Sequence, residues 1–257
     1  MTKPRALVFS GYGLNCEDET KFAFDRVGAE ADIVHINDLI VKPFIFNNYQ
    51  IAAIPGGFSY GDDLGSGRAY GLRVKNHLGE QLQKFLERDT LMIGICNGFQ
   101  ILTTSGVLPG ALLENSGARY LDRWIDLKVT GESPWLFGLE KFSLPIAHGE
   151  GRYYMSQKEF KKIKSEGRVV LKYERGEICK WLNMPADPNG SQELTAGITS
   201  YNGRVLGLMP HPERAQFFTQ LPNWANLREE YSRTGKEIPK DGPGIAIFNN
   251  AVRYFNT

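Results

Sequence analysis

A cysteine flanked by glycines is the strongest chemical signal in this 257-residue sequence. The stretch GICNG at residues 94–98 follows an apolar run and precedes a segment with helical spacing. This is the nucleophile-elbow pattern, in which only small residues fit two positions before and two after the nucleophile. The start of the following helix favours the thiolate form of Cys96, and the N–H of Asn97 is placed to donate to an oxyanion. The pattern predicts a nucleophile at Cys96, with a buried structural cysteine as the alternative.

A cysteine nucleophile needs a base, and the sequence offers four histidines. His35 and His77 fall in a predicted strand and a predicted helix, so we expect structural or exposed roles for both. His211 lies in the sequence PHPE, directly after a predicted strand. Residues two apart in an extended segment point the same way, so Glu213 can orient the imidazole of His211 while that ring faces the thiol. We therefore predict a triad of Cys96, His211 and Glu213; for PHPE alone, a strand end with a surface salt bridge is the alternative.

A glycine-rich turn, PGGFSYGD at residues 55–62, follows another apolar run. Its backbone N–H groups predict a second oxyanion donor, from either Gly57 or Phe58. An ordinary turn is the alternative. A phosphate-binding loop is a weaker interpretation, because the pattern G-x-x-x-x-G-K-[ST] is absent from the sequence.

The elements that must position these groups alternate between apolar runs and helical patterns through the first hundred residues. Because the runs are continuously apolar, they indicate a parallel sheet covered by helices on both faces. Ligands bind such sheets outside the carboxyl ends of the strands, where the glycine-rich turns and Cys96 lie. The predicted strands span residues 5–10, 31–36, 51–54 and 91–95, and the predicted helices span residues 17–27, 69–86 and 98–104.

The second half of the chain contains shorter strand patterns with hairpin-like spacers. Asn202 and Gly203 form a strong hairpin signal between two of them. We expect an antiparallel section, then a polar excursion over residues 216–243 and a last helix over residues 245–254, all within a single domain spanning residues 1–257. The predicted strands span residues 124–129, 142–147, 169–173, 178–182, 195–201 and 205–209.

The composition excludes several function classes. The 30 Lys and Arg balance 29 Asp and Glu for a formal net charge of +1, which predicts neither nucleic-acid nor membrane binding. No apolar stretch approaches the ~20 residues of a membrane span, and the start of the chain lacks a signal-peptide pattern. The three cysteines, Cys16, Cys96 and Cys179, form neither a disulfide framework nor a metal-ligand pattern. We expect a cytoplasmic protein.

With these residues in hand, the sequence resembles the class I glutamine amidotransferases. That family combines PGG after one strand, G-x-C-x-G-x-Q at the elbow and HPE near the end, and all three occur here in order. Longer stretches resemble the branch of the family that serves purine biosynthesis. The resemblance implies an α/β, flavodoxin-like fold, with a mostly parallel central sheet, helices on both faces and a smaller antiparallel section. The longer stretches are residues 57–67, 94–100, 114–120, 147–153 and 209–214.

The resemblance also implies the chemistry of each site residue. Cys96 would attack the side-chain amide of glutamine, and His211, oriented by Glu213, would move the protons. A glutamyl thioester on Cys96 would then be hydrolysed to glutamate. His148 is better interpreted as a binding-loop residue than as the base. The implied oxyanion donors are Gly57, Phe58 and Asn97, and the implied glutamine-binding residues are Gly56, Gln100, His148, Gly149 and Glu150.

The implied partners are other chains. Ammonia would pass to a synthetase subunit that uses ATP and Mg to aminate formylglycinamide ribonucleotide, with a small bridging subunit between them. We expect neither cofactor nor metal in this chain, because it has no ATP-binding signature and little room for another domain. Either a partner interface or ordinary solvation would account for Arg119, Tyr120, Arg123 and Arg152.

Three other functions compete with this interpretation. An amidotransferase subunit of another synthase would share the triad but not the stretches at residues 58–67 and 148–153. A hydrolase of another class, such as a cysteine peptidase, would share the elbow but not PGG together with HPE. A non-catalytic subunit is expected to have lost Cys96, His211 or Glu213, and none is lost.

Overall fold

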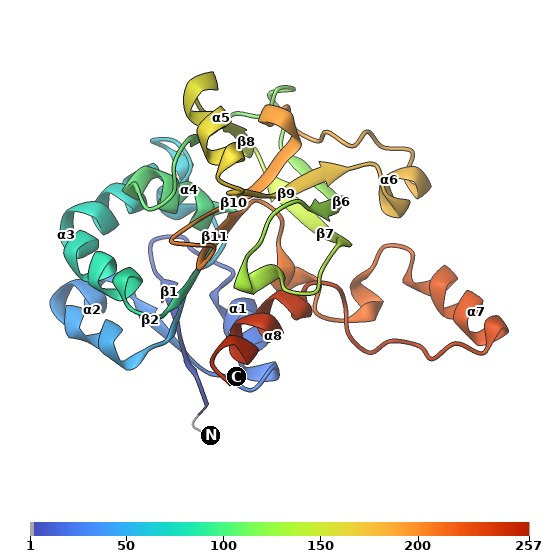
Figure 1. The fold of residues 1–257 in the computed structure, drawn as a ribbon, viewed down its shortest axis with the longest axis horizontal. Coiled ribbons are helices and arrows are strands. Elements are labelled where there is room, and N and C mark those ends of the chain that lie inside the picture. Colours follow the sequence, from blue (N-terminus) through green and yellow to red (C-terminus); the bar gives the residue numbers. More distant parts are fainter. Residues whose placement is uncertain (1–2, 257) are drawn as a thin grey trace.

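A nine-stranded sheet forms the centre of the computed structural model, which describes residues 3–256 (Figure 1). Its strand order is β2-β1-β3-β4-β11-β10-β9-β6-β7. The first five strands in this order pair in parallel, as their continuous apolar runs predict. These strands are β1 (Arg5–Ser10), β2 (Glu30–His35), β3 (Ile51–Ile54), β4 (Leu91–Ile95) and β11 (Val205–Leu208).

The antiparallel section continues the same sheet. The predicted hairpin at Asn202 and Gly203 is confirmed: Ser200 pairs with Val205, and both turn residues have positive φ, 57° and 82°. The remaining strands are β10 (Thr195–Ser200), β9 (Val169–Glu174), β6 (Leu121–Val129) and β7 (Lys141–His148), with β5 (Ala111–Leu113) and β8 (Arg152–Tyr154) in a separate two-stranded sheet.

Helices pack against the parallel strands in two groups (Figure 1). α3 (Arg68–Glu87) contacts α4 (Asn97–Ser105), which in turn lies on β3 and β4. α1 (Glu17–Arg26) contacts α8 (Ile245–Tyr254), and the rings of Phe24 and Phe248 meet edge to face at 5.0 Å between them. The apolar strands between these groups are fully buried, so they hold the carboxyl ends of β3, β4 and β11 rigidly at one edge.

One predicted strand is wrong. Residues 178–182 lie not in a strand but largely in α6 (Glu177–Trp181). The carboxylate of Asp126 on β6 accepts the N–H groups of Ile178 and Cys179 at 3.2 and 2.8 Å, which stabilises the first helical turn. A short apolar run does not by itself distinguish a strand from a helix, and the residue that decides lies far away in the sequence.

Three further helices were not predicted: α2 (Ile36–Val41), α5 (Gln157–Ser165) and α7 (Trp224–Thr234), the last of which lies within the expected polar excursion. α2 begins at His35, whose ring accepts the N–H of Asn37. α5 begins at Ser156, whose hydroxyl accepts the N–H of Glu159 at 3.3 Å. The spacing of Ser156 and Glu159 is that of a capping box, a signal that the sequence does contain.

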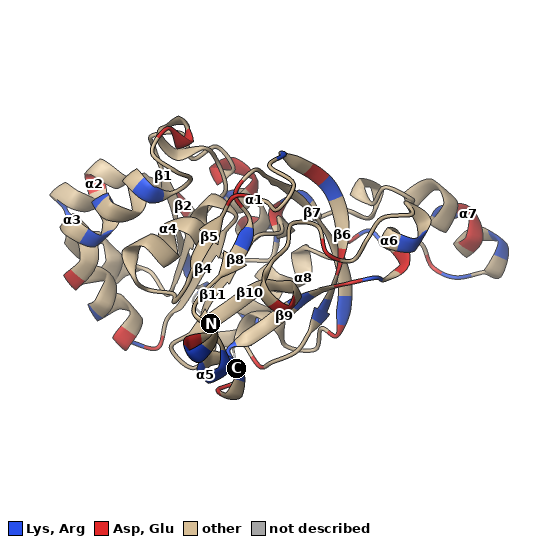
Figure 2. Cartoon of the chain, turned by 90° about the horizontal axis from the view of Figure 1, so that it is seen from above, with Lys and Arg blue, Asp and Glu red and all other residues tan. Residues whose placement is uncertain are grey.

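The excursion over residues 216–243 extends away from the body of the molecule as α7 (Trp224–Thr234), in which no residue is buried (Figure 1). It is anchored at its base, where Phe217 and Asp241 form a β-bridge and Arg26 pairs with Asp241. The ring of Phe218 lies 6.1 Å from that of Tyr231 and joins α7 to this base. Figure 2 shows acidic and basic residues interspersed along the outer helices, α3 and α7 among them.

Short 3₁₀ segments connect several of these elements. These segments are Pro43–Asn48, Ser59–Asp62, Pro134–Leu136, Gln192–Leu194, Pro212–Arg214 and Phe218–Gln220.

Among the helices within residues 3–256, none is long and apolar enough to cross a membrane.

Candidate active site

The turn between β4 and α4 has the strained geometry of a nucleophile elbow. Cys96 has φ 51° and ψ −105°, a conformation that a side-chain-bearing residue rarely adopts. A Cβ atom at Gly98 would lie 1.9 Å from the carbonyl oxygen of Ile54, and one at Gly94 would lie 2.5 Å from Leu102. The predicted need for glycine on both sides of the cysteine is therefore confirmed.

The sulfur of Cys96 lies at the edge of the sheet in a nearly closed environment. The residue is 5% exposed, and its Sγ is 3.6 Å from the carbonyl oxygen of Ala147. Its backbone N–H donates to the carbonyl of Leu208 on β11, which fixes the elbow to the neighbouring strand. The N–H of Asn97, first residue of α4, donates to no acceptor among residues 3–256, so it is available to an oxyanion beside the sulfur.

His211 and Glu213 form a buried pair beside this sulfur. The ring Nδ1 of His211 lies 2.5 Å from Oε1 of Glu213, and each residue is 1% exposed. Burial alone lowers the pKa of His211, but the charge of Glu213, together with Cys96, outweighs it and raises that pKa well above 6.5. Because Glu213 occupies Nδ1, the other ring nitrogen of His211 is left to serve the thiol. The structure thus brings the three residues of the predicted triad together.

The glycine-rich turn distinguishes the two predicted oxyanion donors. The N–H of Phe58 donates to the carbonyl of Gly13 at 2.9 Å, so the turn itself occupies that donor. The N–H of Gly57 makes no hydrogen bond within the described chain. A Cβ atom at Gly57 would lie 2.5 Å from the same Gly13 oxygen, and this close approach requires glycine. The structure therefore does not support Phe58, and Gly57 remains the predicted second donor.

Gln100 connects α4 to the loop that follows β7. Its Nε2 donates to the carbonyl of Glu150 at 2.6 Å, and its Oε1 accepts Nδ2 of Asn97 at 2.8 Å. The other side-chain atom of Asn97 accepts the N–H of Ser59 in the glycine-rich turn at 3.3 Å. One buried network therefore joins the elbow, the turn and the loop at residues 149–151. Direct contact of Gln100 with glutamine stays a prediction.

His148, at the end of β7, is held neutral inside this loop. Burial and the nearby charge of His211 lower its pKa to about 3. Its Nδ1 lies 3.0 Å from Oδ1 of Asn115, and a Cβ atom at Gly151 would lie 2.2 Å from its ring. A ring fixed in this way shapes the loop at residues 149–151 and is not suited to act as the base, in line with the sequence interpretation.

Asn115 is a residue to which the sequence analysis gives no role. It is buried, and its Nδ2 donates to the carbonyls of Arg119 and His148. Its Oδ1 accepts the N–H of Gly151 at 3.0 Å. The only sequence signal is its place in one of the stretches that resemble the amidotransferases, because its partners come from other parts of the chain.

A comparison with known families decides the class of the protein. The family model described as "CobB/CobQ-like glutamine amidotransferase domain" matches residues 3–255. The chain belongs to this glutamine amidotransferase family.

Relatives of the amidotransferase are similar to it over almost their whole length. It is 43% identical to "Phosphoribosylformylglycinamidine synthase subunit PurQ" of Methanococcus maripaludis strain C7, over 98% of each chain. It is 39% identical to the protein of the same name from Dehalococcoides mccartyi, over 99% of this chain and 98% of that one. Among solved structures, a chain of "Structure of PurLQS from Thermotoga maritima" aligns with a TM-score of 0.72 and 33% identity, covering 99% of this chain and 100% of that one.

A second thiol lies behind the histidine of the amidotransferase. Cys16 precedes α1 and is 1% exposed. It occupies the N-cap position of α1, but its side chain makes no capping hydrogen bond. Instead, its Sγ accepts a hydrogen bond from the guanidinium of Arg214 at 2.9 Å and lies close to His211.

The residues suggested for a partner interface differ in their surroundings. Tyr120 is 51% exposed, its ring lies 6.1 Å from that of Phe58, and its hydroxyl interacts electrostatically with Cys96. Arg123 donates to the carbonyl of Pro185, and Arg152 to that of Glu114. These two arginines therefore already stabilise loops within the chain.

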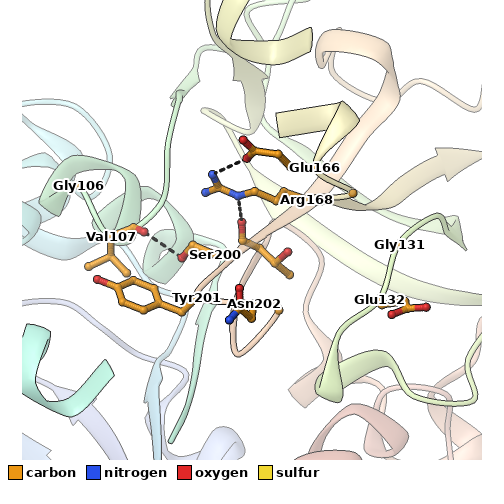
Figure 3. A pocket seen from close by; sticks show the side chains of 12 residues that line it. Gly106, Val107, Gly131, Glu132, Glu166, Arg168, Ser200, Tyr201 and Asn202 are labelled. Carbon is orange, nitrogen blue, oxygen red and sulfur yellow. Dashed lines mark hydrogen bonds and ion pairs between the residues drawn. The ribbon is translucent and has the colours of Figure 1, made fainter. Parts of the chain in front are cut away.

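One hollow on the surface of the described chain is lined by other residues (Figure 3). It has a volume of about 860 Å³ beside the β10–β11 hairpin. The groups on its rim are engaged with backbone: Arg168 donates to the carbonyl of Thr199, and Ser200 donates to that of Val107. None of the predicted site residues lines it.

Proposed function

We propose that this amidotransferase is the glutaminase subunit of a phosphoribosylformylglycinamidine synthase. One observation carries the proposal: a strained elbow presents Cys96 to a buried His211–Glu213 pair at the edge of the sheet. The names of the relatives support the choice of synthase. The proposal assigns Gly56, Gln100, His148, Gly149 and Glu150 to the glutamine pocket.

The first half of the reaction releases ammonia. The thiolate of Cys96 attacks the side-chain amide carbon of glutamine, and the carbonyl electron pair moves onto oxygen. The N–H groups of Asn97 and Gly57 stabilise that oxyanion. When the tetrahedral intermediate collapses, the carbon–nitrogen bond breaks and His211 donates its Nε2 proton to the leaving nitrogen. Ammonia departs, and a γ-glutamyl thioester remains on Cys96.

The second half restores the enzyme. The now neutral Nε2 of His211 removes a proton from water as the water attacks the thioester carbon. The carbon–sulfur bond breaks, glutamate leaves, and the thiolate of Cys96 returns beside the imidazolium of His211. Glu213 holds Nδ1–H throughout, which fixes the ring orientation and stabilises its charged form.

The amination itself is assigned to partner chains. Under this proposal a synthetase subunit binds ATP and Mg and transfers the ammonia to formylglycinamide ribonucleotide, and a small bridging subunit completes the complex. The name PurLQS of the structural neighbour supports a three-subunit assembly. The free state of all three buried cysteines is in line with a reducing, cytoplasmic location.

Reconstitution of the synthase tests this division of labour. The chain is combined with the two partner subunits, ATP and formylglycinamide ribonucleotide, and supplied with either glutamine or ammonium. Cys96→Ala is expected to abolish product formation from glutamine and to retain formation from ammonium. Cys179→Ala, which alters a buried thiol in α6, is the matched control and should retain both. Equal loss of both activities in Cys96→Ala would contradict the proposal, as would use of glutamine by that variant.

A further inference from the structure

The fold assembles a second group of reactive side chains around His211. The Sγ of Cys16, a ring nitrogen of His211 and a carboxylate oxygen of Glu213 all lie within 4.8 Å of one another, and all three residues are buried. The N–H of Cys16 donates to the carbonyl of Gly56 at 3.2 Å, so the segment before α1 is fixed against the glycine-rich turn. The thiol is thus held in place by backbone contacts.

Gly56 provides the space in which the sulfur and the ring approach each other. A Cβ atom at Gly56 would lie 2.7 Å from Cε1 of His211 and 3.4 Å from Sγ of Cys16. Any larger residue would therefore displace the ring from the thiol.

Two atoms of the cluster have unused hydrogen-bonding capacity. Oε2 of Glu213 and Nε2 of His211 are buried and have no hydrogen-bond partner among residues 3–256. Buried polar atoms are rarely left unpaired in folded proteins, because each one costs about 1–3 kcal/mol. The triad reaction uses Nε2 of His211, but it gives no role to Oε2 of Glu213 or to the thiol of Cys16.

We propose that Cys16, His211 and Glu213 bind a thiophilic divalent cation such as Zn²⁺, and that the bound cation inhibits the enzyme. Thiolate, imidazole and carboxylate are the ligands that Zn²⁺ takes in proteins, with bonds of roughly 2.0–2.3 Å. Tetrahedral ligand atoms at those lengths are roughly 3.3–3.8 Å apart. Nδ1 of His211 and Oε1 of Glu213 are 2.5 Å apart, and the three ligand atoms lie within 4.8 Å of one another, so side-chain movements of about 1 Å, which separate the first two, would form the site. Binding forms a metal–sulfur bond at Cys16, and the thiol proton leaves to solvent.

Inhibition follows from which groups the cation occupies. A metal ion held by His211 and Glu213 prevents the imidazole from donating its proton to the leaving nitrogen and prevents the carboxylate from orienting the imidazole. This part of the inference rests on the proposed function, whereas the metal site itself does not.

Arg214 is the cation that a metal ion would have to displace. Its guanidinium donates to Sγ of Cys16 at 2.9 Å, and its Nε lies 3.9 Å from Oε1 of Glu213. A positive charge this close opposes a second one. Arg214→Gln is therefore expected to strengthen metal binding, whereas a thiol with a purely packing role predicts no change.

Metal binding is tested in Cys96→Ala, which removes the nucleophilic thiol from the measurement. Co²⁺ is the spectroscopic probe, because thiolate coordination produces a near-ultraviolet charge-transfer band. We expect one equivalent of Co²⁺ with this band, displaced by Zn²⁺. Adding Cys16→Ser should abolish the band and weaken Zn²⁺ binding at least about tenfold, since one ligand is lost. Adding Cys179→Ser is the matched control and should change neither.

Two results would overturn the proposal: absence of a thiolate band in Cys96→Ala, or persistence of the band after Cys16→Ser. If Cys16→Ser does not fold, zinc-edge X-ray absorption of Cys96→Ala decides instead. One sulfur with nitrogen and oxygen ligands is expected, and a sulfur-free shell would contradict the site. In the intact synthase, Zn²⁺ should inhibit glutamine use and a chelator should reverse it. If the chain proved not to be a glutaminase, the cobalt spectra would still decide the metal site.

Discussion

The catalytic edge and the α7 excursion differ in how much freedom their residues have. Cys96, His148, His211 and Glu213 are each at most 5% exposed, and neighbouring glycines let backbone and rings approach at distances that no side chain would allow. No residue of α7 is buried. Close backbone approach and buried charge therefore restrict which residue types can be accommodated at this edge of the sheet, whereas the exposed α7 has no such restriction.

The two regions also use charge differently. The His211–Glu213 pair is removed from water, and the charge of Glu213 helps to raise the pKa of His211. On α7, Arg233 pairs with Glu229 at 2.8 Å, but the two side chains are 76% and 62% exposed. Water screens such a pair, so its net contribution is small.

Replacing the proposed base is the most severe test of the catalytic edge. His211→Ala should lower kcat for ammonia release from glutamine by several orders of magnitude, about 10⁵-fold or more on the pattern of triad knockouts. His148 cannot substitute, because it is neutral and held by Asn115. The matched control is His77→Ala on the exposed face of α3, which should retain full activity. A loss of only tenfold would show that another base serves.

Glu213→Gln should cost less than His211→Ala. The amide keeps the shape of the side chain but removes the charge that orients and stabilises the imidazolium, so we expect a loss of about 10³–10⁴-fold in kcat. The same variant should lower the pKa of His211, measured by NMR titration, because the charge of Glu213 helps to raise it. A loss in kcat greater than that of His211→Ala would contradict the orienting role.

A pair of glycine substitutions sharpens the contrast in packing. Gly98→Ala forces a Cβ atom toward the carbonyl of Ile54 and should lower the free energy of unfolding by about 3 kcal/mol or more. Gly79→Ala, within α3 and with open space around its Cβ position, should raise it by about 0.5–1 kcal/mol. Urea denaturation measures both. Equal effects would show that the elbow is less tightly packed than the structure indicates.

The pKa of His148 predicts an acid-sensitive catalytic edge. It is about 3 in the folded chain, below the ordinary 6.5, so between these values the unfolded state binds a proton that the folded state does not. Stability should therefore fall as pH falls through this window, by at most about 1.4 kcal/mol per pH unit from this residue. His148→Asn should reduce that slope in denaturant titrations at pH 4–6, and His77→Asn should leave it unchanged. An unchanged slope in His148→Asn would show that the lowered pKa of His148 does not cause the loss of stability in acid.

The smallest effect is expected on α7. Arg233→Ala removes its exposed ion pair and should change the free energy of unfolding by less than about 0.5 kcal/mol. Arg26→Ala should cost more, because Arg26 contacts Asp241, the carbonyl of Gln216 and the ring of Phe217 at the base of the excursion. Thermal unfolding of both variants would test the order, and a larger effect from Arg233→Ala would reverse it.

The sequence predicted those parts of the fold whose signals are local. Continuous apolar runs gave β1, β3 and β4 with their observed bounds, because a strand buried on both faces needs no partner to reveal it. The elbow and the PHPE segment also carry their geometry in adjacent residues. The helix α6 could not be predicted in this way, since the carboxylate of Asp126 that stabilises its start comes from another strand.

At the site, too, the features that depend on contacts between distant segments could not be predicted from the sequence. The N–H of Phe58 is used in a hydrogen bond because the carbonyl of Gly13 lies beside it. The approach of Cys16 to His211 depends on the absence of a side chain at Gly56. Neither contact leaves a pattern in the residues around it. The sequence therefore predicted the triad but not the second thiol beside it.

Covalent labelling of the thiols in the assembled synthase tests the central claim most directly. A glutamine analogue with an electrophilic carbon in place of the amide nitrogen is added, and the modified peptide is identified by mass spectrometry. We expect one adduct, on Cys96, which excess glutamine prevents and Cys96→Ala abolishes. Labelling of Cys16 or Cys179 instead, or labelling of Cys96 that glutamine does not prevent, would contradict it.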